Sequence, residues 1–310
     1  MASMIIENDT MFSHRQRPWH GLGKVVEEAP TSEEALTLAG LDWSVTREPV
    51  YVNGNQIPER YALCRDVDGK FFDIVGENYR VLQNTDAFRI MDVIMERTDG
   101  DGLKFETAGS LYGGKKVYMT CAFEKEHVVA GDSIKTYLLL SNSHNGKSAL
   151  HLAITPIRVV CWNTLQTAIR KAASHWSIPH FRTMEDRVVQ ATRAIWNMRN
   201  YMTEFVRFGE ESAEKRIGEG TIEALAEKLF PIDEGLGEKH RKFMEKKLDL
   251  FERCLNAPDI QKFRGTEWGV LNAVSDFETH FNTISRQRLL GNVLSGSTPL
   301  YRQTLEFLAQ

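Results

Sequence analysis

The sequence lacks the features that would identify several classes of protein at once. Its four cysteines lie far apart and form no C-x-x-C pair, which indicates free buried thiols rather than a disulfide framework. No run reaches the roughly 18 apolar residues of a membrane span. The N-terminus has neither the basic start nor the apolar stretch of a signal peptide. These absences predict a cytoplasmic protein with no membrane partner.

The chain also has little excess charge. It carries 38 Lys and Arg against 42 Asp and Glu, a net charge of −4 with a pI near 6.2. This balance argues against indiscriminate coating of nucleic acid, so any contact with a polyanion must be local. With 310 residues, 42% of them hydrophobic, the chain can bury a sizeable core in two domains, or in one domain with a substantial extension.

The N-terminal half contains short alternating segments separated by turn dipeptides. These dipeptides are Asn53-Gly54, Asp68-Gly69, Gly113-Gly114 and Asn145-Gly146. They tolerate the positive φ of tight hairpins, and strands joined by tight turns must be antiparallel. Helices are predicted after a capping box at residues 31–34 and over residues 85–97, and Pro156 is expected to end the sheet.

Helical spacing prevails after the strands. A helix over residues 161–174 is predicted from an apolar seam formed by Trp162, Leu165, Ile169, Ala172 and Trp176. A long helix over residues 183–208, a hinge at residues 209–220 and further helices follow. We therefore expect an α+β fold. A largely antiparallel, hairpin-rich sheet with packed helices and an N-terminal arm occupies residues 1–180, and a helical C-terminal region occupies residues 181–310.

The most distinctive charge pattern lies in residues 141–200. This window holds eight Lys and Arg and two acidic residues, a net charge of +6, so the other residues together carry −10. A cationic segment with interleaved His and Trp in an acidic chain is typical of a local site for a polyanion. If the strand and the following helix pack together, the cations outline one groove.

The residues predicted to bind nucleic acid all lie in this window and have cationic or polar side chains. They are Lys147, Arg158, Asn163, Arg170, Lys171, His180 and Arg182. The cations would neutralise backbone phosphates, with Asn163 and His180 in secondary roles, while exposed aromatic rings stack bases. The alternative is that the charges form only a solvated helix face. For Trp162 and Trp176, which share the apolar seam, a core position is favoured.

Patterns for other chemistry are incomplete. Residues 109–116 nearly match a phosphate-binding loop, but Lys116 replaces the required hydroxyl and a strand pattern follows, so a glycine hairpin with exposed lysines is the better interpretation. Five potential metal ligands, without a second closely spaced pair, are His144, His151, Cys161, His175 and His180. We therefore predict no metal site. No catalytic motif is present in its structural context, so no catalytic residue is assigned.

The segment at residues 14–24 is a second basic and aromatic patch. Its Pro and Gly residues are typical of a loop or arm. We expect this arm to contact either the same nucleic-acid-binding surface or a neighbouring subunit.

Three motifs give the chain a resemblance to a known family. They are PWHGLG at residues 18–23, LSNSHNG at residues 140–146 and RVVCWNTL at residues 158–165. Over nearly its whole length the chain resembles a phage/plasmid-like protein family found in phages, prophages and plasmids. Asn145 stands where that family usually has Asp, which preserves the turn chemistry. The resemblance implies a mobile-element setting in a bacterial host cell and no established activity.

At the level of the fold, the order of elements is similar to that of the phage single-strand annealing recombinases, the RecT, Redβ and Erf group. That resemblance implies rings or filaments that hold single-stranded DNA in a basic groove. We therefore predict a phage or mobile-element protein that binds single-stranded DNA or RNA as a homo-oligomer and promotes strand annealing or recombination. Annealing requires no bond chemistry, so no cofactor is expected. The alternatives are a protein-interaction module acting on a host factor and a metal-assisted nuclease or hydrolase.

Overall fold

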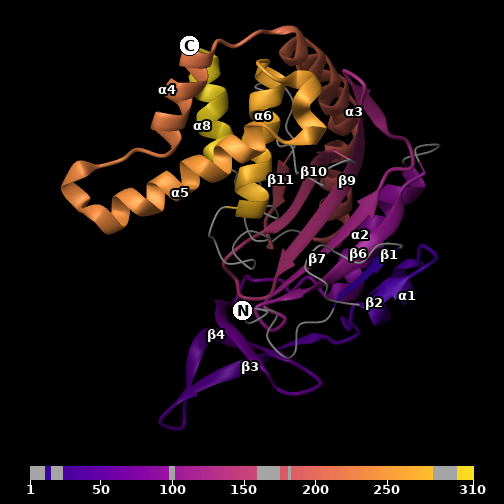
Figure 1. Cartoon of the computed structure of the whole chain (residues 1–310). Helices are drawn as coiled ribbons and strands as arrows, with labels where there is room; N and C mark the ends of the chain where they lie inside the picture. Colours follow the sequence, from indigo (N-terminus) through magenta and orange to yellow (C-terminus); the bar gives the residue numbers. More distant parts are fainter. Residues whose placement is uncertain (1–10, 15–23, 98–101, 159–174, 181–182, 282–298) are drawn as a thin grey trace. The chain divides into compact units, whose positions relative to one another are not determined.

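The computed structural model describes residues 11–14, 24–97, 102–158, 175–180, 183–281 and 299–310 (Figure 1). The chain divides into two compact units, which we call the sheet unit and the helical unit. The sheet unit comprises Met1–Lys125, Tyr137–Ile154 and Ser174–Met198, and the helical unit comprises Glu126–Thr136, Thr155–Ala173 and Arg199–Gln310. The predicted α+β class, with largely antiparallel sheets and a helical C-terminal region, is confirmed.

The larger sheet contains eight strands among the described residues, in the order β11-β10-β9-β7-β6-β1-β2, with β8 pairing β9. The strands are β1 Met11–His14, β2 Lys24–Val26, β6 Lys104–Leu111, β7 Lys116–Ala122, β8 His127–Val129, β9 Asp132–Ser143, β10 Leu150–Arg158 and β11 His175–Ile178. The pairs β6–β7, β7–β9 and β10–β11 are antiparallel, whereas β1 and β2 are parallel. Val117, Met119 and Cys121 on one face of β7 are buried, and so are Tyr118 and Ala122 on the other face, so this strand is largely buried on both sides.

The smaller sheet has the order β3-β4-β5, with β3 Val45–Val52, β4 Asn55–Arg65 and β5 Phe71–Gly76. Asn53 (φ 51°) and Gly54 (φ 80°) form the predicted two-residue turn between β3 and β4. β5 pairs only with Arg60–Cys64 of β4. Among the described residues, no third strand pairs with the outer part of the β3–β4 hairpin, which is therefore a two-stranded ribbon (Figure 1).

Two helices complete the described part of the sheet unit before β6. α1 Ser32–Leu38 starts at the predicted capping box, in which Thr31 and Glu34 hydrogen-bond reciprocally. α2 Asn84–Arg97 buries the predicted apolar face that includes Ala87, Met91 and Ile94. Both helices thus form where local sequence signals and burial agree.

The helical unit is built around aromatic side chains. The helices of the C-terminal part begin with α3 Met184–Glu214, which starts in the sheet unit and continues into the helical unit at Arg199. The helical unit then contains α4 Glu219–Leu229, η1 Glu234–Leu236, α5 Glu238–Leu255, η2 Pro258–Phe263, α6 Glu267–Asp276, the π-helix η3 Phe277–Phe281 and α8 Pro299–Leu308. Phe230, Phe251 and Phe277 pack together at ring distances of 4.9–6.3 Å. Edge-to-face aromatic contacts of this kind stabilise a core beyond the area they bury.

Two predictions about strands are wrong. β10 continues through Pro156 to Arg158, which is possible because β11 pairs only with residues 150–153 of β10. Trp176 lies in β11 opposite Leu152, so it follows the two-residue period of a strand and does not continue a helical seam. The helix predicted over residues 161–174 lies outside the described residues.

Of the arm predicted at residues 14–24, the structure describes only His14 in β1 and Lys24 in β2, so that prediction is not tested. The hinge predicted at residues 209–220 is corrected in part, because α3 continues to Glu214 and the break before α4 lies at residues 215–218. Met11–His14 form β1, between β6 and β2, and His14 is 4% exposed, close to Glu106. Gly209 lies inside α3, where a Cβ would overlap Val129 and lie 3.3 Å from the Trp268 ring. Glycine at this position therefore allows close packing and does not interrupt the helix.

Candidate functional site

The polar motif at the end of β9 is buried. Residues 141–144 are at most 2% exposed. The side-chain amide of Asn142 donates to the carbonyl of Leu82 (3.0 Å), and the hydroxyl of Tyr79 donates to the carbonyl of Ser143 (3.1 Å). These bonds attach the end of β9 to the segment that precedes α2, so these motif residues position the backbone.

His144 is held in one tautomer by Asn84. The Asn84 amide nitrogen donates to the carbonyls of Leu41 (3.0 Å) and Trp43 (3.2 Å), so its oxygen accepts from Nε2 of His144 at 2.9 Å. Nδ1 of His144 is then a buried acceptor without a hydrogen-bond partner among the residues that the structure describes. Burial, with a smaller contribution from His180, lowers the pKa of His144 to about 3, so the ring is neutral at physiological pH.

Aromatic rings and a glycine turn surround His144. Its ring stacks on Phe72 (5.9 Å between ring centroids) and contacts Trp43 edge-on (5.3 Å). Gly114, in the turn between β6 and β7, packs against the same group. A Cβ there would lie 3.2 Å from the Trp43 ring and 3.3 Å from Nη1 of Arg65. This close approach and the φ of +94° together require glycine at position 114.

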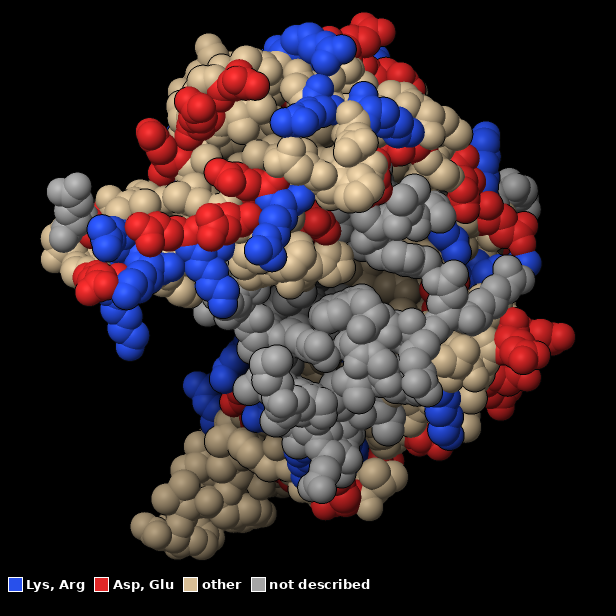
Figure 2. All heavy atoms as spheres, viewed as in Figure 1, with Lys and Arg blue, Asp and Glu red and all other residues tan. Residues whose placement is uncertain are grey.

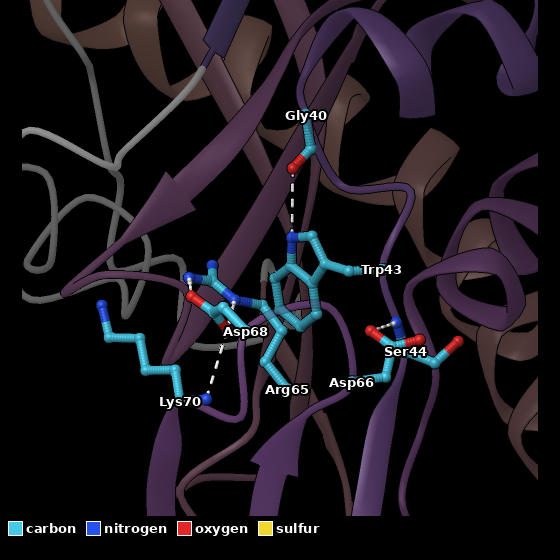
Figure 3. Close-up of polar contacts among 7 residues, drawn as sticks. All are labelled: Gly40, Trp43, Ser44, Arg65, Asp66, Asp68 and Lys70. Atoms are coloured by element: carbon cyan, nitrogen blue, oxygen red, sulfur yellow. Dashed lines mark hydrogen bonds and ion pairs between the residues drawn. The ribbon is translucent and has the colours of Figure 1, made fainter.

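Arg65 connects this buried group with the surface (Figure 3). It is 8% exposed, and its guanidinium lies 5.4 Å from the Trp43 ring. Nε and Nη2 donate to the two carboxylate oxygens of Asp68 at 2.8 and 2.5 Å. These bonds, together with the backbone N–H of Lys70, lower the pKa of Asp68 to about 2. The bidentate pair fixes the turn between β4 and β5.

Lysines and exposed aromatic rings lie at the β4–β5, β6–β7 and β9–β10 turns. We refer to Lys70, Phe71, Tyr112, Lys115 and Lys147 as the lysine surface. The Lys70 ammonium occupies the place where a Cβ on Gly113 would lie. The backbone N–H of His144 donates to the carbonyl of Lys115 (2.8 Å), which joins the β6–β7 turn to the hairpin that carries Lys147.

Asp73 lies near two of these lysines, Lys147 and Lys115. Nζ of Lys147 lies 3.1 Å from Oδ2 of Asp73. The pKa of Asp73 is lowered first by the backbone N–H of Ile74, then by Lys147 and by the charge of Lys115. Both ammonium groups are therefore close to one carboxylate, at the edge of the smaller sheet.

The two aromatic members of the lysine surface are exposed. Phe71 follows Lys70 directly and is 51% exposed, and Tyr112 precedes Gly113 directly and is 40% exposed. Tyr112 has a φ of +55°, a left-handed conformation that is uncommon for a residue with a side chain. Such conformations gather at functional sites more often than elsewhere.

Two of the residues predicted from the sequence to bind nucleic acid have side chains that the structure describes. Lys147 is 74% exposed and belongs to the lysine surface. His180 is buried: its ring stacks on Tyr79 at 4.8 Å, and Nε2 donates to the carbonyl of Ser148 (3.0 Å). His180 therefore holds the hairpin that carries Lys147 and does not face the solvent.

The other predicted residues are not brought into this site by the described part of the chain. Arg158 is the last residue of β10. The following predicted residues lie outside the described residues: Asn163, Arg170, Lys171 and Arg182. Sequence reasoning assigned no nucleic-acid-binding role to Lys70 and Phe71. Their only signal was the Asp68-Gly69 turn before them, which does not reveal that Gly113 lies alongside.

The carboxylates near the lysine surface compete with an anionic ligand for the lysine ammonium groups. Asp68 and Asp73 have side chains that are 44% and 28% exposed. Partly exposed ion pairs of this kind contribute about 0–1 kcal/mol, so a phosphate group can replace a carboxylate partner of Lys147 at little cost. Over the visible face of the molecule, basic and acidic side chains alternate (Figure 2).

The structure also bears on three other features considered from the sequence: a phosphate-binding loop, a metal site and a membrane span. Lys116 begins strand β7, so residues 109–116 form the expected glycine hairpin and not a phosphate-binding loop, but Lys115 and Lys116 are only partly exposed. Among the described residues, no group of three His, Cys, Asp or Glu side chains is placed to hold a metal ion. None of the described helices is long and apolar enough to cross a membrane.

Comparison with known proteins gives one match. The model of the family described as Domain of unknown function (DUF932) matches residues 72–298, which is most of the chain. The matched segment includes Tyr112, Lys115 and Lys147 and begins one residue after Phe71. No curated protein and no solved structure matches the chain.

Proposed function

The chain belongs to the family described as Domain of unknown function (DUF932), and on that premise we propose that it binds single-stranded nucleic acid through the lysine surface. The observation that carries this proposal is the grouping of three lysines with two exposed aromatic rings around three turns of the sheet unit, β4–β5, β6–β7 and β9–β10. Ammonium groups neutralise phosphates, and exposed rings stack bases without regard to sequence.

The buried group behind the surface supports this role. Arg65, Trp43 and His144 fix the backbone of the turns that carry Lys70, Lys115 and Lys147. Preorganised cations lose less conformational entropy on binding than cations on mobile segments. His144 is neutral above pH 4 and has no charge to contribute, so the lysines and not the histidine provide the attraction for phosphate.

The proposal includes the cationic window of the sequence. Arg158, Asn163, Arg170, Lys171 and Arg182 would extend the same phosphate contacts, and His180 would act by supporting the hairpin. The proposed setting is a phage or another mobile element, in which an oligomer of this chain would anneal two strands. The motif resemblance to phage and plasmid proteins favours that setting, and annealing by charge neutralisation needs no cofactor.

The test is the salt dependence of binding. Fluorescence anisotropy of a labelled single strand at several salt concentrations gives the slope of log K against log salt. The triple variant Lys70→Ala, Lys115→Ala, Lys147→Ala should bind more weakly, with a slope smaller by about 2, because each lost single-strand phosphate contact removes about 0.7.

A charge-matched control removes three exposed lysines from α5: Lys239→Ala, Lys242→Ala and Lys246→Ala. This variant has the same net charge as the first and should keep the wild-type slope. Equal losses in both triple variants would mean that the overall charge of the chain attracts the strand, and would contradict a site at the lysine surface.

A further inference from the structure

The outer end of the β3–β4 hairpin has an unusual composition. Residues 49–58 contain no Lys, Arg, Asp or Glu, although charged residues make up 26% of the chain. Figure 2 shows this end as a protrusion without charged side chains. Tyr51 is 60% exposed and Val52 is 53% exposed, and the amides of Asn53 and Asn55 are exposed beside them.

The ribbon projects without support from β5. The β4 residue nearest the turn that still pairs with β5 is Arg60. Arg60 is five residues from Asn55, where β4 begins at the turn, so the unsupported part of the ribbon is about 17 Å long at 3.4 Å per residue. Isolated two-stranded hairpins are marginally stable in water. A charge-free ribbon with an exposed tyrosine at its end is therefore a costly arrangement unless it has a binding partner.

The register gives the ribbon two distinct faces. Tyr51 lies opposite Gln56, and Val52 lies opposite Asn55. Residues directly opposite each other in a pair of strands project to the same side, so Tyr51 and Gln56 share one face. An aromatic ring beside a side-chain amide suits a nucleic-acid base, because the ring stacks on the base and the amide bonds its edge.

We propose that this face of the ribbon, Tyr51 with Gln56, stacks against and hydrogen-bonds unpaired bases of a strand whose phosphates are held by the lysine surface. The inference rests on the proposed function and assigns base contacts to an element without charge. Along β4, Gln56 and Cys64, the partner of Phe71, are eight residue steps apart, a distance of about 27 Å. That distance covers several nucleotides, within the roughly 4–16 nucleotides of known single-strand sites.

Two observations favour bases over a protein partner. A stable protein interface buries about 800 Å² on each side, whereas this end of the ribbon offers only two large apolar side chains that are more than half exposed, Tyr51 and Val52. The amides of Asn53, Asn55 and Gln56 supply both donors and acceptors, which is the chemistry of base edges. The absence of charge also fits contact with bases and not with phosphates.

The experiment compares a labelled single strand with an abasic strand of the same length. Both are titrated by anisotropy with the wild type and with Tyr51→Ala, Tyr51→Phe and Val52→Ser, the last being a control on the opposite face of the same ribbon. Tyr51→Ala should weaken binding of the base-containing strand roughly five- to a hundredfold, the range for loss of one stacked base, and leave abasic binding unchanged. Tyr51→Phe and Val52→Ser should behave like the wild type.

The outcomes separate this inference from the proposed function. Wild-type binding of both strands, unchanged by Tyr51→Ala, would overturn the base contact while the lysine surface remains. No binding of either strand by the wild type would overturn both. Light scattering on the same samples tests another occupant of the ribbon: a smaller particle for Tyr51→Ala, with unchanged preference for bases, would assign Tyr51 to contact between copies of the chain and overturn the inference.

Discussion

At the level of single residues, the buried side chain of Asn84 connects segments that are far apart in the sequence. Its hydrogen bonds reach Leu41, Trp43 and His144, and all of its partners are buried or belong to backbone near the core. The same bonds decide which nitrogen of His144 carries the proton. One amide therefore fixes both the path of the chain before β3 and the chemical state of the histidine.

Asn84→Ala should destabilise the protein by about 3 kcal/mol, because it leaves the N–H of His144 and two carbonyl groups without their partner in a buried site. Urea unfolding of both proteins measures this change.

The control is Gln83→Ala. The Gln83 side chain also makes two hydrogen bonds, both with the backbone of Val45, but it is partly exposed and water can replace them. The Gln83→Ala substitution should lower the free energy of unfolding by less than about 1 kcal/mol. A similar loss in the two variants would show that burial of the Asn84 network is not the source of its stability.

At the level of elements, helix α3 depends on a residue that usually weakens helices. Gly209 lies in its interior and packs against Val129 and the Trp268 ring. Glycine is less favourable than alanine in a helix by about 1 kcal/mol, so its presence must be offset by contacts that a side chain would prevent. β8, α3 and α6 of the helical unit meet at this position.

Gly209→Ala should therefore destabilise the helical unit, by about 1–3 kcal/mol, despite the better helix propensity of alanine, because the added methyl group overlaps Val129. Gly220→Ala in α4 is the matched control, since nothing lies within 4 Å of its Cβ position and the φ of Gly220 is not positive. It should be neutral or stabilising by up to about 1 kcal/mol. Thermal unfolding followed by circular dichroism distinguishes the two, and a stabilising Gly209→Ala would refute the packing argument.

At the level of the whole molecule, each of the two units contains a buried titrating group, and the two groups change stability with pH in opposite directions. In the sheet unit, burial lowers the pKa of His144 from 6.5 to about 3. In the helical unit, burial raises the pKa of Glu278 from 4.5 to about 7, although the backbone N–H groups of Tyr301 and Leu300 at the start of α8 act against this. Each group binds protons differently in the folded and unfolded states, so each links stability to pH.

The signs of the two effects are opposite. Folded His144 binds a proton more weakly than the unfolded chain, so lowering the pH from 7.5 to 5 should destabilise the sheet unit by about 2 kcal/mol. Folded Glu278 binds a proton more strongly, so the same change should stabilise the helical unit by about 2 kcal/mol. Hydrogen exchange of core amides in each unit, corrected for intrinsic rates, measures both.

Glu278→Gln isolates the second effect. The two N–H groups of α8 bond different oxygens of Glu278, and the single amide oxygen of glutamine can accept only one of them. Because the charge is gone, the variant should gain stability relative to the wild type when the pH rises from 5 to 7.5. Glu223→Gln, at an exposed position of α4, should change stability at neither pH. A Glu278→Gln variant that gains nothing relative to the wild type over this pH change would exclude an unfavourable buried charge.

Local signals in the sequence predicted most of the elements. The turn dipeptides, the capping box at Thr31 and the apolar faces of α2 and α3 act between neighbours along the chain, and the structure has these elements where the signals lie. The errors have physical causes. β1 is too short to show a period. Gly209, taken for the start of a hinge at residues 209–220, lies inside α3, where the absence of a side chain leaves room for Val129 of β8.

The sequence by itself determined the α+β class and the hairpins, because hydrophobic period and turn chemistry are properties of contiguous residues. Only the tertiary structure decided which cations share a surface. Lys70, Lys115 and Lys147 come from three separate turns, and the strand register that brings them together depends on long-range burial. For the same reason the polar residues of the β9 motif proved to be buried supports, while the charge-free ribbon became visible as a surface.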